Sequence, residues 1–117
     1  MQVHLHADHL TDGSQSMSDH LSTVVNKALG RFGDRITRVE AHLSDADGAA
    51  KPGVDDIHCT LEARLIGMET VVVKDRAGSA HQAIDGAVHK LKRAVGAEVA
   101  RHDPRKPARA AVPPISA

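Results

Sequence analysis

Residues 79–99 constrain the fold of this chain more strongly than any other segment. Their apolar side chains recur at helical spacing (i, i+4, i+7, i+11, i+15) and form a stripe along one side of the predicted helix. The stripe consists of Ile84, Val88, Leu91, Val95 and Val99. Most helices gain their stability by burying such a stripe, so the rest of the chain must supply a layer that covers it.

A second amphipathic helix is predicted from Met17 onward over about four turns. Two glycines follow it, and Gly33 is the better stop signal. Ser16 or Ser18 is a candidate N-cap, because a serine hydroxyl accepts hydrogen bonds from the first helical turn. The apolar residues of this helix are Met17, Leu21, Val24, Val25, Ala28, Leu29 and Phe32.

Four other segments have the pattern of strands, because their apolar and polar residues alternate or because β-branched residues fill them. These segments are residues 2–6, 37–45, 56–65 and 70–76. Residues 66–69 fit a hairpin turn, and Ser79 fits the N-cap of the final helix. We therefore predict an α+β fold of two layers. Its order is β-α-β-β-β-α, with both helices packed on one face of a four-stranded mixed sheet.

The chain divides into one predicted domain, residues 1–102, and a tail, residues 103–117. A chain of 117 residues is long enough for one modest core. The tail holds four of the five prolines and has no helical or strand periodicity. We expect it to be a flexible, basic extension.

The core must be aliphatic, because the sequence has one Phe and neither Tyr nor Trp. This composition argues against proteins that bind single strands by stacking bases on aromatic rings. The formal net charge is zero, but the charges are unevenly distributed. Residues 1–60 have five Lys and Arg against nine Asp and Glu, whereas residues 61–117 have ten against six. The second half is therefore the basic one.

Cations on the outer faces of the two helices form the first candidate site. If the helices pack side by side, these residues make one ridge that could bind RNA phosphates and read the shape of an RNA duplex without aromatic residues. The alternative is an ordinary solvated helix face, where Lys and Arg are common. The candidate residues are Lys27, Arg31, His89, Lys90, Lys92 and Arg93.

Histidines on the polar side of the predicted strands form the second candidate site. If the strands are neighbours, up to four imidazoles gather on one sheet face, and imidazole is a ligand for zinc, copper or nickel. The alternative is a polar face with cross-strand pairs to Glu40 and Glu62. The histidines are His4, His6, His42 and His58.

Nothing in the sequence indicates catalysis. Cys59 is the only cysteine and lies among inward-facing residues, so we expect a buried structural thiol. No phosphate-binding glycine loop, nucleophile elbow or zinc-protease motif is present. We therefore expect no enzymatic activity, no cofactor and no small-molecule substrate. The sequence has neither a membrane-spanning run nor a signal-peptide pattern, which favours a cytoplasmic protein.

Three segments resemble the ribosome hibernation-promoting factors and ribosome-associated inhibitors. They are residues 1–4, residues 31–40 and residues 83–93, where the Ala83-Ile-Asp and Lys90-Leu spacing is the most specific. The resemblance extends over residues 1–102 and implies the same β-α-β-β-β-α fold. His81 stands where that family usually has an aromatic residue.

This resemblance to a short form of the family implies a non-enzymatic protein of stationary or stressed cells. Such a protein binds the small ribosomal subunit and its ribosomal RNA in the channel for mRNA and tRNA, at the A and P sites, and inhibits translation. The helix residues named above would contact the RNA. A chain without the family's second, dimerising domain is expected to be monomeric off the ribosome. The alternative is a metal- or protein-binding stress protein on the same fold.

Overall fold

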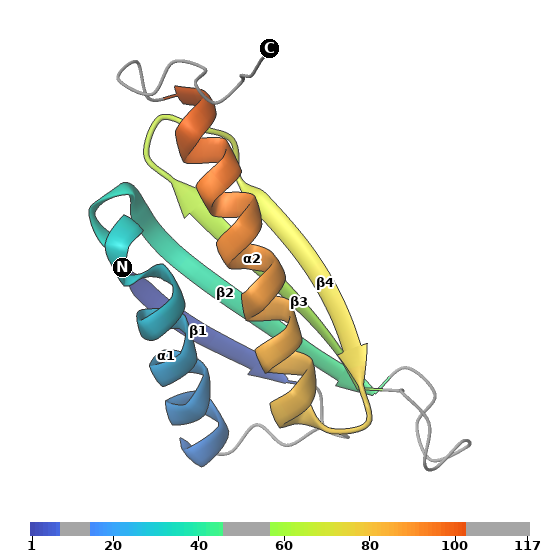
Figure 1. The fold of residues 1–117 in the computed structure, drawn as a ribbon. Coiled ribbons are helices and arrows are strands. Elements are labelled where there is room, and N and C mark those ends of the chain that lie inside the picture. The colour runs from blue at the N-terminus through green and yellow to red at the C-terminus, as the bar shows by residue number, and fades with distance from the viewer. Residues whose placement is uncertain (8–14, 46–56, 103–117) are drawn as a thin grey trace.

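A four-stranded sheet and two helices form the two layers of this protein, described here from a computed structural model (Figure 1). The structure describes residues 1–7, 15–45 and 57–102. The elements are β1 (Gln2–Ala7), α1 (Gln15–Leu29), a 3-10 helix η1 (Gly30–Arg35), β2 (Ile36–Asp45), β3 (Ile57–Leu65), β4 (Val71–Ala77) and α2 (Ala80–His102). The predicted α+β fold and its order of elements are confirmed.

The strands lie in the order β1-β2-β3-β4. β1 is parallel to β2 because α1 carries the chain back across the sheet between them, whereas the β2–β3 and β3–β4 pairs are antiparallel. Both helices cover the same face, with α2 lying along β3 and β4 and α1 lying against β1 (Figure 1). The other face of the sheet carries no described helix.

The core fills the space between the sheet and the helices. Every residue of the predicted stripe on α2 is buried, as are four of the apolar residues predicted for α1. The residues of β3 opposite them alternate between buried and at least partly exposed, as the period of two requires. The largest fully buried side chains are Leu21, Leu29, Leu61, Ile84 and Leu91. The core is aliphatic, as the composition predicts.

Two local predictions are confirmed by backbone geometry. The β3–β4 hairpin turns at Gly67, whose φ of 71° lies in the left-handed region that glycine adopts without strain. Ser79 caps α2, because the Gln82 N–H donates to Ser79 Oγ at 3.2 Å. The turn precedes the start of β4, and the cap sets where α2 begins.

The ends of α1 differ from the prediction. The helix begins at Gln15, so Ser16 and Ser18 lie within its first turn and neither precedes it as an N-cap. The α-helix ends at Leu29, and the chain tightens into η1, which contains Gly33. Tightening the last turn into a 3-10 helix satisfies carbonyls that an α-helix end leaves unpaired.

Two predicted loops and the predicted tail fall largely on residues 8–14, 46–56 and 103–117, outside the described part of the chain. Among the helices of the described ranges, none combines the length and the apolar character that crossing a membrane requires.

Candidate RNA-binding surface

An open hollow of about 270 Å³ lies between η1 and α2 on the outer side of the helix layer. Its lining consists of Arg31, Phe32, His89, Lys92, Arg93 and Gly96. Three of these six residues carry a permanent positive charge, one is a histidine, and none is acidic. Four of the six RNA-binding residues predicted from sequence thus come together at one place. We call this hollow, with its six residues, the cationic hollow.

The only phenylalanine of the chain shapes the cationic hollow. A Cβ added at Gly96 would lie 3.7 Å from Phe32 Cζ, an ordinary van der Waals distance, so Phe32 of η1 lies against α2 at this glycine. The Arg31 guanidinium lies over the Phe32 ring, 5.0 Å from its centroid, which is a cation–π geometry. Phe32 is half-buried and packs against the edge of the core, and its ring holds the exposed Arg31 guanidinium above the hollow.

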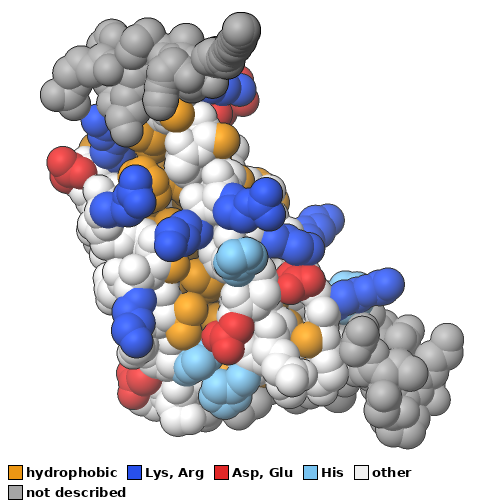
Figure 2. Space-filling view, in the orientation of Figure 1, with side chains coloured by type: hydrophobic (Ala, Val, Ile, Leu, Met, Phe, Trp, Pro, Cys, Tyr) orange, Lys and Arg blue, Asp and Glu red, His pale blue; other side chains and the backbone are white. Residues whose placement is uncertain are grey.

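Lys27 lies in the last turn of α1, outside the lining of this hollow. It is exposed and comes four residues before Arg31, so the two side chains project from adjacent turns of the helical segment. Figure 2 shows Lys and Arg side chains gathered on this side of the protein, over α2 and the end of α1. The cations therefore extend beyond the hollow along α1.

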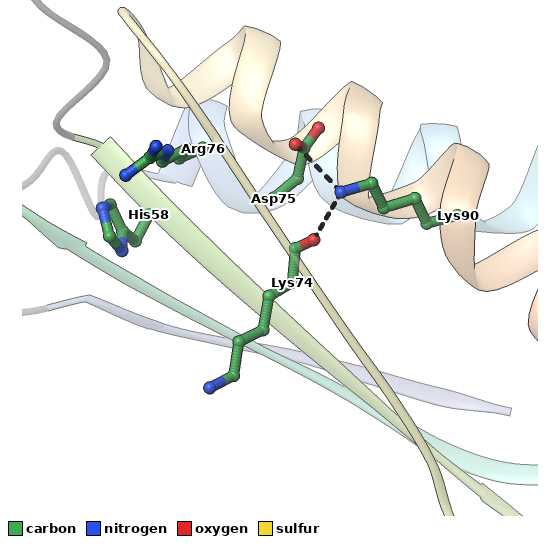
Figure 3. A pocket seen from close by; sticks show the side chains of 5 residues that line it. All are labelled: His58, Lys74, Asp75, Arg76 and Lys90. Carbon is green, nitrogen blue, oxygen red and sulfur yellow. Dashed lines mark hydrogen bonds and ion pairs between the residues drawn. The ribbon is translucent and has the colours of Figure 1, made fainter.

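Lys90, the remaining predicted residue, lies on the opposite flank of α2. Residues two positions apart on a helix are separated by about 200° around its axis, so Lys90 and Lys92 cannot share one side. Lys90 Nζ donates to the Lys74 carbonyl oxygen at 2.9 Å and to Asp75 Oδ1 at 3.3 Å. Figure 3 shows it reaching from α2 across to β4.

These contacts belong to a second hollow, of about 310 Å³, whose described lining is His58, Lys74, Asp75, Arg76 and Lys90. Here Asp75 offsets part of the positive charge. The Lys90–Asp75 pair is half-exposed, so it adds less than about 1 kcal/mol to stability, but it directs the ammonium group toward the sheet. Lys90 is thus held away from the cationic hollow.

Asp75 was not singled out from the sequence, because it follows a β-branched run without an obvious role. The β3–β4 register places it opposite Cys59, on the side of the sheet that α2 covers. A Cβ at Gly86 would overlap the Asp75 carboxylate, so this glycine makes room for the acid beneath α2. Burial, and next the Asp75 charge, raise the pKa of the Cys59 thiol to about 12. The buried, structural thiol predicted from sequence is confirmed.

The N-terminal part of α2 contacts α1 through polar side chains. His20 Nε2 and Asp85 Oδ1 lie 2.9 Å apart, and the His20 and His81 rings pack at 4.4 Å between centroids. His81, at the position where the resemblance predicts an aromatic residue, therefore contacts α1. These contacts align the two helices, and with them the two sides of the cationic hollow.

On the open sheet face the structure brings together two of the four predicted histidines. His6 and His42 are opposite each other in the β1–β2 register and their rings stack at 4.7 Å. His4 lies instead 3.3 Å from the side-chain oxygen of Gln2. His58 is paired in register with Ser44 and Arg76, which places it next to a cation.

The fold and this surface together define the class of protein: a small two-layer α+β protein with a cationic helix face. Residues 4–102 match the family model described as Sigma 54 modulation protein / S30EA ribosomal protein. Because the match covers most of the chain, the protein belongs to this family, which is one of ribosome-associated proteins. A search of curated proteins finds no match.

Solved structures share the fold. The N-terminal domain of Thermus thermophilus Protein Y matches with a TM-score of 0.63 and 20% identity, covering 80% of this chain and 93% of that one. A ribosomal subunit interface protein from Coxiella burnetii matches with a TM-score of 0.59 and 16% identity, covering 85% and 99%. At these identities the likeness concerns the fold alone.

Proposed function

We propose that this protein binds the small ribosomal subunit through its ribosomal RNA and inhibits translation during stationary phase or stress. Residues 1–102 are the binding domain, and they occupy the channel for mRNA and tRNA at the A and P sites. The role is steric and non-enzymatic, it is carried out in the cytoplasm, and the protein is monomeric off the ribosome. The observation that carries this proposal is the cationic hollow, in a member of a ribosome-associated family.

The positive charge of this surface is concentrated where an RNA backbone could lie. Arg31, Lys92 and Arg93 surround one hollow, and guanidinium groups bind phosphate oxygens with two parallel hydrogen bonds. Each phosphate that a protein cation contacts releases counterions, which supplies most of the affinity for a nucleic acid. His89 adds a fourth polar group that can donate to a phosphate oxygen.

The zero net charge of the chain does not oppose this function. In physiological salt, charges interact over a Debye length of about 8 Å. The interaction energy of a phosphate in the hollow is therefore determined by the cations beside it and not by the net charge of the chain. The acidic residues of the first half of the chain reduce long-range attraction to RNA instead. We therefore expect slower association than a strongly basic protein would have.

Lys27 and Lys90 take different parts in the proposed interface. Lys27 is exposed beside Arg31 and extends the phosphate contact along α1. Lys90 contributes little, because an RNA contact would require it to leave Asp75 and the Lys74 carbonyl oxygen.

The test is co-sedimentation with purified small subunits of a charge-reversal variant of the hollow, Arg31→Glu, Lys92→Glu, Arg93→Glu. The matched control reverses three exposed cations of the sheet layer, Arg64→Glu, Lys74→Glu, Arg76→Glu, and so changes the net charge equally. The proposal expects the first variant to stay in the supernatant and the control to pellet like the wild type. Equal loss in both variants, or in neither, would contradict it.

A further inference from the structure

We propose that His6, Glu40 and His42 form a binding site for a divalent transition-metal cation, with zinc as the expected metal. The three residues lie on the open face of the sheet, opposite the face that the helices cover. The site is thus separate from the cationic hollow, and the proposal does not depend on RNA binding.

The strand register brings the three side chains to one place. β1 and β2 are neighbours, with His6 directly opposite His42, and Glu40 lies two residues before His42 on the same face. Glu40 Oε1 lies 3.6 Å from His6 Nε2 and 3.8 Å from His42 Nε2. The three ligand atoms all lie within 4.8 Å of one another.

These distances are close to those of an occupied zinc site. With bonds of about 2.0–2.1 Å, two ligand atoms of a tetrahedral zinc lie about 3.3–3.5 Å apart. The two oxygen-to-nitrogen separations therefore exceed the required value by only a few tenths of an ångström. The ligands come from two hydrogen-bonded strands, so the backbone that carries them is already in place.

Arg38 prepares the carboxylate for this role. Its guanidinium binds Glu40 Oε2 at 2.9 Å, which leaves Oε1 directed toward the two imidazoles. In metal sites a hydrogen-bonded neighbour of this kind orients the ligating group. The Glu40 side chain is only 20% exposed, so water competes weakly for its free oxygen.

The imidazoles must turn for both to ligate one ion. Their rings are stacked within 15° of parallel, whereas each lone pair lies in its own ring plane and must aim at the metal. The side chains of His6 and His42 are 54% and 52% exposed, so neighbouring atoms leave room for this rotation. Two imidazoles and one carboxylate leave the fourth zinc position to water.

The ligand set favours zinc, copper and nickel over magnesium and calcium. Imidazole nitrogen suits borderline metals, whereas the hard cations require mainly oxygen ligands. His4 and His58 share the face but not the cluster, so they are matched controls: removing either deletes the same ring without removing a ligand.

Isothermal titration of the full, untagged chain with zinc chloride, after removal of metal by a chelator, tests the site. We expect one equivalent to bind, a loss of at least about tenfold in affinity for His42→Ala and Glu40→Gln, and unchanged binding for His58→Ala. Circular dichroism checks that each variant is folded. The absence of saturable binding, or equal affinity in wild type and folded His42→Ala, would overturn the proposal.

Discussion

Two lysines of α2, only two residues apart, should differ in their effect on RNA binding when each is replaced by alanine. Lys92 lines the cationic hollow, whereas Lys90 is bound to Asp75 and to the Lys74 carbonyl oxygen on the other flank. Replacing either with alanine removes one positive charge from the same helix. The two variants therefore have the same net charge and the same change in helix propensity, and their substitutions lie at almost the same point along α2. They differ only in the side of the helix that loses its lysine.

The magnitude follows from counterion release. One phosphate contact adds about 0.7–0.9 to the slope of log affinity against log salt concentration. Four contacts, from Lys27, Arg31, Lys92 and Arg93, give a slope of about −3, so a fourfold rise in salt lowers affinity roughly a hundredfold. Lys92→Ala should reduce the magnitude of the slope by almost one. The fourfold rise in salt then lowers the affinity of this variant by a factor about threefold smaller than for the wild type.

Affinity for purified small subunits, measured by filter binding between about 50 and 200 mM salt, checks this expectation. Lys92→Ala should bind more weakly at low salt and with a shallower slope, and Lys90→Ala should follow the wild-type line. If Lys90→Ala flattens the slope as much as Lys92→Ala does, the RNA contacts the opposite flank of α2 and the cationic hollow is not the interface.

Three further outcomes follow from single side chains. Phe32→Leu keeps an apolar contact with Gly96 but removes the ring beneath Arg31, and should weaken small-subunit binding by about twofold to fivefold in the same assay. Ser79→Ala should lower the free energy of unfolding by about 1 kcal/mol in urea denaturation, with recovery in Ser79→Thr. Cys59 has a pKa raised from 9.0 to about 12, so the folded state keeps a proton that the unfolded state loses. The free energy of unfolding of the wild-type protein should therefore fall, relative to that of Cys59→Ala, by about 1.4 kcal/mol per pH unit above pH 9.0. Parallel curves of unfolding free energy against pH for the two proteins would refute this.

The sequence predicts the fold well because periodicity determines which side chains can be buried together. The change from a period of two to one of 3.6 separates strands from helices, and a buried stripe such as that of α2 leaves few alternatives for the layer it covers. Ser79 and Gly67 mark chain reversals by local hydrogen bonding and backbone freedom. These signals depend on only a few neighbouring residues, so they can be recognised in the sequence without knowledge of the tertiary structure.

The site is harder to predict because it depends on how separate elements pack. Periodicity puts Lys90 and Lys92 on the exposed part of one helix but does not say which neighbour each will meet. The approach of η1 to Gly96 and the position of Asp75 beneath Gly86 decide that question, and both arise from contacts between distant segments. In the same way, only the β1–β2 register brings His6 to His42.

Ultraviolet cross-linking of the protein to small subunits, followed by mass spectrometry of the RNA-linked peptides, tests the central claim most directly. We expect ribosomal RNA to be attached to peptides from η1 and the middle of α2, around Arg31–Phe32 and Lys92–Arg93. Cross-links confined to β4 and the open sheet face, around Arg64, Lys74 and Arg76, would show that the protein binds RNA through its other side and would contradict the account.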